Sequence, residues 1–283
     1  MIAKEFGTDR GTIRYWIEKG PADDGAFLVF LPGLTADHRL FEKQTACFSG
    51  RRGCLVWDAP GHRASRPFEF SFSLADKARW LKGILEREDV RCPVLVGQSM
   101  GGYVAQVFME LFPGTAKGFI AIDSSPLQRS FYTAAELWLL KRMEPLYRLY
   151  PWNALVRSGA KGCAETPYGR DLMKEMMRTY DGDKAYYAKL AGHGYRMVAE
   201  AVEADRPYLI DCPARLICGE RDRAGSTKRY NRAWHGRTGL PVSWIPGAGH
   251  NANTDCPDAV NDIIAAFAEE IEGSWNRKER ADT

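Results

Sequence analysis

The stretch from residue 94 to residue 104, VLVGQSMGGYV, constrains the fold more than any other part of the chain. Apolar and small residues precede a serine, and glycines follow it, in the pattern Gly97-Gln98-Ser99-Met100-Gly101. This G-x-S-x-G pattern is typical of a sharp turn that lifts a serine from the end of a strand onto the start of a helix. A strand must therefore precede Ser99, and a helix must follow it.

Strand and helix patterns alternate on both sides of this turn. Short β-rich runs predict strands at residues 12–20, 25–33, 53–62, 92–97, 117–123, 213–222 and 241–246. Helical patterns, several of them amphipathic, predict helices at residues 73–88, 101–112, 226–236 and 257–272. Such alternation is typical of the α/β class, with a mostly parallel, doubly wound sheet covered by helices on both faces.

One long block interrupts the alternation. From about residue 125 to residue 205 the chain is rich in Tyr, Met, Leu and Arg at helical spacing, and no convincing strand pattern occurs there. We therefore expect residues 125–205 to form a helical cap, inserted into an α/β core that residues 1–124 and 206–283 build together. The polar end, residues 273–283, is expected to be a frayed tail, and no function is assigned to it.

A serine hydroxyl is a weak nucleophile at neutral pH, so it needs a histidine as base and a carboxylate that orients this base. His250 lies in a glycine-rich turn after the last predicted strand, and Asp222 follows the strand before it. We predict that Ser99, Asp222 and His250 are catalytic. Asp123 also ends a strand near the nucleophile and is the alternative acid, whereas His62 is expected to be structural or to support the surrounding loops.

The site also needs donors for the negative charge that develops on the attacked carbonyl oxygen, and backbone N–H groups suit this task because they are fixed dipoles. Pro32-Gly33 ends a predicted strand and lets the chain turn sharply, so that the N–H of Leu34 can point at the site. Met100 follows the nucleophile at the start of a helix and supplies the second N–H. We predict an oxyanion hole made by Leu34 and Met100.

Five motifs in this order, LPGLTAD, WDAPGHRAS, GQSMGG, GERD and GAGH, resemble those of the α/β-hydrolase superfamily, in its cap-bearing branch with a serine nucleophile. The resemblance covers roughly residues 10–272 and implies a cap between the sixth and seventh strands. Two positions depart from the common pattern: Pro32 stands where similar proteins often have histidine, and Arg63 replaces a glycine. We expect Arg63 to place a long cation near the rim of the site.

Composition excludes several other classes of function. The formal charge of +3 is small and evenly spread, which argues against a nucleic-acid partner. The histidines lack metal-ligand spacing, and no glycine-rich phosphate loop occurs, so we expect neither a metal nor a cofactor. No signal peptide or membrane span is predicted, and the seven widely spaced cysteines are expected to be reduced, so a cytoplasmic protein is the expectation.

These features predict an enzyme that cleaves a small, largely apolar carboxylic ester, or a related acyl compound, through an acyl-enzyme. A C–C bond hydrolase, a thioesterase or a lactonase with the same triad remains open, as does a small-ligand receptor on the same fold. The oligomeric state is open too. The cap supplies ten large side chains, more than half of which we expect to hold its helices together: Phe131, Tyr132, Trp138, Met143, Tyr147, Met173, Met176, Met177, Tyr186 and Tyr187.

Overall fold

The structure is a computed structural model that describes residues 1–21 and 25–282, with side chains up to Ser274. In the described residues, eight strands form one sheet in the order β1-β2-β4-β3-β5-β6-β7-β8. The strands are β1 (Ile2–Thr8), β2 (Gly11–Glu18), β3 (Phe27–Leu31), β4 (Cys54–Trp57), β5 (Pro93–Gln98), β6 (Gly118–Ile122), β7 (Ala214–Gly219) and β8 (Val242–Ile245). Strands β3 to β8 run parallel to one another, whereas β2 is antiparallel to both of its neighbours, β1 and β4. The predicted α/β fold is therefore confirmed.

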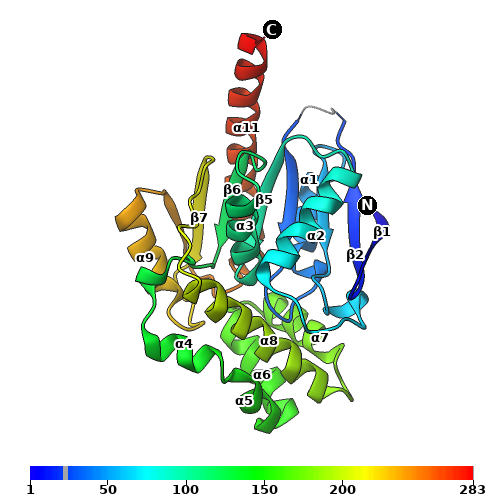
Figure 1. The fold of residues 1–283 in the computed structure, drawn as a ribbon, viewed down its shortest axis with the longest axis vertical. Coiled ribbons are helices and arrows are strands. Elements are labelled where there is room, and N and C mark those ends of the chain that lie inside the picture. Colours follow the sequence, from blue (N-terminus) through cyan, green and yellow to red (C-terminus); the bar gives the residue numbers. More distant parts are fainter. Residues whose placement is uncertain (22–24, 283) are drawn as a thin grey trace.

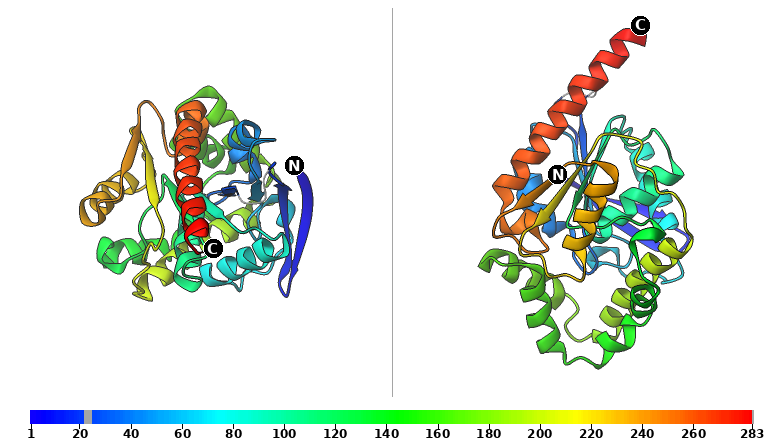
Figure 2. Two further views of the ribbon diagram at one scale, coloured as in Figure 1. Left: turned by 90° about the horizontal axis from the view of Figure 1, so that it is seen from above. Right: turned by 90° about the vertical axis from the view of Figure 1, so that its left-hand side faces the viewer.

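Helices cover both faces of the sheet. In β3, Val29 and Leu31 pack into one apolar cluster, whereas Leu28 and Phe30 pack into another on the opposite face. The first cluster includes residues of α2 (Leu74–Arg87), α3 (Met100–Leu111) and α9 (Thr227–Thr238), and the second includes residues of α1 (Glu42–Phe48) and α11 (Pro257–Asp282). Figures 1 and 2 show α2 and α11 on opposite sides of the sheet. A strand buried on both faces explains the continuous apolar runs in the sequence.

The segment between β6 and β7 is helical in the described residues. Its helices are α4 (Ala134–Leu140), α5 (Met143–Leu149), α6 (Trp152–Cys163), α7 (Pro167–Arg178) and α8 (Lys184–Glu203). They gather at one end of the sheet, below it in Figure 1. The short helix α10 (Ala252–Asp255) precedes α11. The division of the chain into a core and a cap at residues 125 and 205 stays a prediction.

Two predictions about the chain ends are wrong. We expected the first strand at residue 12, but β1 lies before it and pairs with β2 in a hairpin. Its residues are at least partly exposed, so they form no apolar run that the sequence would reveal. The frayed tail from residue 273 is wrong too, because α11 continues to Asp282, through residues that include several good helix formers. Figure 2 shows this helix projecting beyond the rest of the molecule.

Each helix within the described residues is too short or too polar to cross a bilayer.

Candidate active site

Ser99 stands at the sharp turn between β5 and α3. Its backbone has φ of 48° and ψ of −113°, a conformation that non-glycine residues rarely adopt. The glycines around it are required by close contacts: a Cβ on Gly101 would lie 1.8 Å from the carbonyl oxygen of Leu31, and one on Gly97 would lie 2.4 Å from the nitrogen of Gly102. The serine is thus held in a strained turn that only this glycine pattern permits.

Asp222 and His250 form a buried pair. The Nδ1 atom of His250 lies 2.9 Å from Oδ2 of Asp222, and the other carboxylate oxygen accepts a hydrogen bond of 2.7 Å from the N–H of Ala224. The two residues come from the loops after β8 and β7. Because the carboxylate contacts Nδ1, it favours the tautomer in which Nε2 carries the free lone pair.

Burial alone would lower the pKa of His250. The negative charge of Asp222 and the hydrogen bond to it raise the pKa more, so it lies above the ordinary value of 6.5. The pair therefore stabilises the imidazolium, which a base that accepts a serine proton must form.

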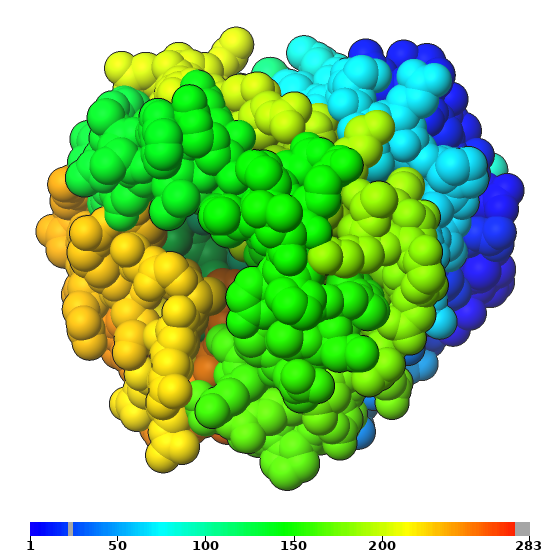
Figure 3. Space-filling view, turned by 90° about the horizontal axis from the view of Figure 1, so that it is seen from below, coloured from blue at the N-terminus to red at the C-terminus, as the bar shows by residue number. Residues whose placement is uncertain are grey.

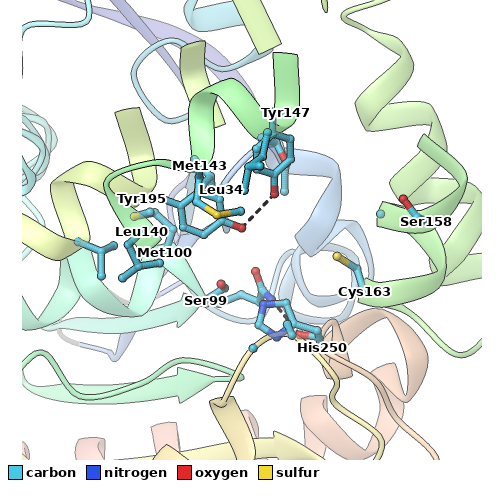
Figure 4. A pocket seen from close by; sticks show the side chains of 18 of the residues that line it. Leu34, Ser99, Met100, Leu140, Met143, Tyr147, Ser158, Cys163, Tyr195 and His250 are labelled. Atoms are coloured by element: carbon cyan, nitrogen blue, oxygen red, sulfur yellow. Dashed lines mark hydrogen bonds between the residues drawn. The ribbon is translucent and has the colours of Figure 1, made fainter. Parts of the chain in front are cut away.

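Ser99 and His250 line the same cavity, although no hydrogen bond joins their side chains in the described residues. Figure 4 shows both side chains at the floor of this space. In proteins without bound ligand, the contact between a nucleophile and its base is often long and tightens only when substrate binds. The arrangement is compatible with transfer of the serine proton to His250.

Asp123, the alternative acid, makes different contacts. It is fully buried, and its two oxygens accept hydrogen bonds from the N–H of Gly219, at 2.7 Å, and from the N–H of Ala252, at 3.0 Å. Gly219 ends the strand that leads to Asp222, and Ala252 lies two residues after His250. Burial and the charge of Asp222 raise the pKa of Asp123 well above 3.8. Asp123 therefore links the two loops, whereas Asp222 contacts the imidazole.

The Leu34 loop lies directly against the serine turn. A Cβ on Gly33 would lie 2.2 Å from Oε1 of Gln98 and 3.3 Å from Cβ of Ser99, so glycine is needed for this approach. Leu34 and Met100 both line the cavity beside Ser99. Neither backbone N–H donates to a protein acceptor among the described residues, so both remain available to a ligand oxygen.

His62 and Gln98 hold the loops of the site. The N–H of Thr35 donates to Nε2 of His62 at 3.1 Å, and burial keeps this imidazole neutral by lowering its pKa to about 3. Gln98 donates from Nε2 to the carbonyl oxygen of His250 at 2.9 Å. Sequence reasoning anticipated a supporting role for His62 but missed Gln98, because position x of the G-x-S-x-G pattern carries no signal of its own.

The cavity above Ser99 has a volume of about 690 Å³. Figure 3 shows a hollow on this side of the molecule, between α4 and the segment that leads from β7 into α9. Six of the ten side chains named above line it: Tyr132, Met143, Tyr147, Met173, Met177 and Tyr187. Four of these six also belong to the buried apolar clusters, so the expectation that more than half of the ten hold the helices together stays a prediction. Helical spacing is the same for a side chain that faces a core and for one that faces a cavity.

The charge that we expected at the rim of the site is absent from the cavity wall. Among the described lining residues there is no Lys or Arg, and Glu136 is the one acidic residue. Arg63 instead turns to Asp37, with Nη1 3.4 Å from Oδ2 of this aspartate. The wall is otherwise mostly Leu, Met and Tyr side chains, which suits a ligand that is largely apolar.

Two clusters bring potential metal ligands within 4.8 Å of one another, Asp37 with His38 and Asp58, and Asp123 with Cys218 and Asp222. Their oxygens are already used. Asp58 accepts from the N–H of His38 and from its ring at 2.8 Å, and Asp123 accepts two backbone N–H groups. The chemistry of these clusters is therefore that of hydrogen-bonded loop anchors.

Comparison with known proteins agrees with this geometry. The sequence profile of the Alpha/beta hydrolase family matches residues 28–263, most of the chain. The chain belongs to this family. The protein is therefore an alpha/beta hydrolase.

This alpha/beta hydrolase is similar, at low sequence identity, to a named hydrolase, an esterase and a lactonase. The 2-(acetamidomethylene)succinate hydrolase of Mesorhizobium japonicum is 22% identical, over 88% of this chain and 89% of its own. An esterase from Thermogutta terrifontis has a TM-score of 0.78 at 19% identity, over 96% of this chain and 100% of its own. The enol-lactonase from Burkholderia xenovorans LB400 has a TM-score of 0.69 at 18% identity, over 91% of this chain and 96% of its own. The TM-scores show the shared fold, whereas the low identities leave the substrate open.

Proposed function

We propose that this alpha/beta hydrolase cleaves a small, largely apolar carboxylic ester, or a related acyl compound, through a Ser99–His250–Asp222 triad. One observation carries the proposal: His250, which is hydrogen-bonded to the buried Asp222, lines the same largely apolar cavity as Ser99 in its strained turn. No disulfide joins any of the seven cysteines, all of which lie within the described residues, and this agrees with a reducing, cytoplasmic setting. Residues 125–205 act as the cap that closes the cavity over the substrate.

In the proposed reaction the hydroxyl oxygen of Ser99 attacks the ester carbonyl, and Nε2 of His250 takes the serine proton. Asp222 accepts from the Nδ1–H of His250 throughout and stabilises the imidazolium. The backbone N–H groups of Leu34 and Met100 donate to the oxyanion of the tetrahedral intermediate.

The intermediate then collapses to an acyl-enzyme, and His250 returns the proton to the departing alkoxide. A water molecule attacks the acyl-enzyme with His250 again as base. This second attack releases the acid and regenerates the hydroxyl of Ser99.

The proposal is tested with a fluorophosphonate probe, which reacts covalently with an activated serine. We expect the wild-type protein to be labelled and Ser99→Ala to stay unlabelled, with the modified residue mapped to Ser99 by mass spectrometry. The exposed Ser49→Ala provides the control, because this residue lies outside the cavity and should leave labelling intact. Label on any other serine would remove Ser99 from the mechanism.

Turnover separates an enzyme from a receptor on the same fold. Purified protein is assayed on p-nitrophenyl esters, lactones and acyl-thioesters, and we expect the esters to be hydrolysed with a loss of several orders of magnitude in Ser99→Ala. A protein that is labelled at Ser99 but hydrolyses none of these compounds would be a receptor or would act on another bond.

A further inference from the structure

Two tyrosines that the proposed mechanism does not use meet in the wall of the cavity. Tyr147 comes from α5 and Tyr195 from α8, and their hydroxyl oxygens lie 3.1 Å apart. Their rings are stacked, with centroids 6.0 Å apart. Figure 4 shows both hydroxyls, joined by a dashed line, facing the space above Ser99 and His250.

The hydrogen bonds of this pair leave one donor unused. Each phenol has a single O–H, and only one of the two O–H groups is needed for the bond between them. The other O–H has no acceptor among the described residues, apart from its tyrosine partner. The pair therefore offers one O–H donor and free lone pairs to whatever occupies the cavity.

This donor is uncharged over the whole range in which the protein would work. Burial raises the pKa of Tyr147 to about 12 and the pKa of Tyr195 well above 10. The described lining residues include no lysine or arginine, so no cation among them would balance the negative charge of an anionic ligand. The lining carboxylate of Glu136 stays ionised, because hydrogen bonds from Thr133 and Tyr230 outweigh the effect of burial and hold its pKa at about 2.

The helix that carries Tyr195 also contacts the predicted oxyanion loop. Gly194 precedes Tyr195 in α8, and a Cβ on this glycine would lie 2.4 Å from Cδ1 of Leu34. Helix α8 is thus in direct contact with the predicted oxyanion loop. Because Ser99, Tyr147 and Tyr195 line the same cavity, one arm of a ligand whose carbonyl is held at Ser99 can extend towards the tyrosines.

We propose that the Tyr147–Tyr195 pair is a polar subsite, which binds an uncharged oxygen on one arm of the substrate. This inference rests on the proposed ester hydrolysis and specifies the substrate class: a neutral ester whose arm carries a ketone or similar carbonyl oxygen. An arm that ends in a carboxylate is disfavoured, because its charge would lose hydration without gaining a cation.

Three esters of matched length test the subsite. They are p-nitrophenyl hexanoate, p-nitrophenyl 5-oxohexanoate and the p-nitrophenyl monoester of adipic acid, each rate being divided by its uncatalysed rate. One buried neutral hydrogen bond should favour the oxo ester over the plain ester roughly three- to tenfold in kcat/KM, mainly through KM. The acidic ester should be the poorest of the three. Hexanoate esters of a keto alcohol and its plain analogue test the other arm.

Variants separate the subsite from general effects on the fold. Tyr147→Phe combined with Tyr195→Phe should bring the ratio between the oxo and plain esters close to one. Tyr186→Phe, on the same helix but outside the cavity lining, should keep the wild-type ratio. A wild-type ratio in the double variant, or a preference for the acidic ester, would overturn the subsite.

A binding measurement makes failure of the subsite distinguishable from failure of the proposed hydrolysis. Methyl 5-oxohexanoate and methyl hexanoate are titrated into Ser99→Ala by calorimetry, with and without the two phenylalanines. Tighter binding of the oxo ester that disappears in the phenylalanine variant supports the subsite even where no ester is turned over. Equal binding of both esters, together with normal turnover of p-nitrophenyl hexanoate, contradicts the subsite alone.

Discussion

The assignment of the catalytic acid gives the sharpest prediction, because two buried aspartates lie close together and contact different partners. In Asp222→Asn, the side chain can present an N–H₂ group to Nδ1 of His250, which favours the wrong tautomer of the imidazole. We expect kcat to fall on the order of 10³- to 10⁴-fold. The fold should persist, since asparagine retains an oxygen for the N–H of Ala224.

Asp123→Asn should act on stability more than on chemistry. Both oxygens of Asp123 accept backbone N–H groups, from Gly219 and Ala252, and asparagine can replace only one of these acceptors. One buried N–H is left unpaired, at a cost of about 1–3 kcal/mol in the free energy of unfolding. Because the imidazole keeps its own carboxylate, the loss in kcat should stay below about tenfold.

The pH profile adds an independent readout. The proposed reaction needs neutral His250, and Asp222 raises the pKa of this residue above 6.5, so activity should fall as the pH drops through a midpoint above that value. Removing the charge in Asp222→Asn should move the midpoint to lower pH, whereas Asp123→Asn should move it little. Rates on p-nitrophenyl butyrate between about pH 5 and pH 9 measure kcat and the pH midpoint of each variant. Urea unfolding measures the free energy of unfolding. The reverse ranking of the two variants in kcat would transfer the acid role to Asp123.

Two further predictions concern the core and the cap. Burial lowers the pKa of Lys77 from 10.5 to about 7. Between these pH values the unfolded chain therefore holds a proton that the folded chain lacks. As a result, the free energy of unfolding should rise with pH by up to roughly 5 kcal/mol. Lys77→Met should be more stable at pH 6 and should lose this rise in urea unfolding followed by circular dichroism; an unchanged slope would contradict the argument. Met143→Ala, which enlarges the cavity, should shift the preference in kcat/KM towards esters with longer acyl chains, while the fluorophosphonate probe still labels Ser99. An unchanged preference would argue against the proposed cap as the element that determines specificity.

The core of the site was predictable because close packing leaves few alternatives there. A Cβ on Gly101 would lie 1.8 Å from a backbone oxygen of β3, so the residue type and the local geometry imply each other. The positions of Asp222 and His250 follow from a similar rule, since the loops at the carboxyl ends of parallel strands converge on one edge of the sheet. The sequence pattern therefore predicted which aspartate and which histidine the structure brings within hydrogen-bond distance.

The hairpin at the N-terminus shows the opposite case. Strand β1 pairs through its backbone with β2, and its side chains are exposed or half-buried. An edge strand of this kind needs no particular side chains, so its sequence carries charges where an apolar alternation would have marked a strand. Only the pairing partner, which lies in the next segment, indicates that the chain is extended there.

Residues 125–205 were predictable as helical, but the orientation of these helices was not, because of the way their apolar side chains are distributed. Several of its apolar side chains stay exposed, among them Leu139 at 48% and Leu146 at 51%, and both also line the cavity. A tightly packed helix shows an apolar stripe that faces the core, whereas these helices divide their apolar residues between the core, the cavity and the solvent. Periodicity cannot separate these three environments. The Tyr147–Tyr195 contact joins residues 48 positions apart in the chain, on two helices whose relative rotation is set by packing, and only the folded structure brings the two hydroxyls together.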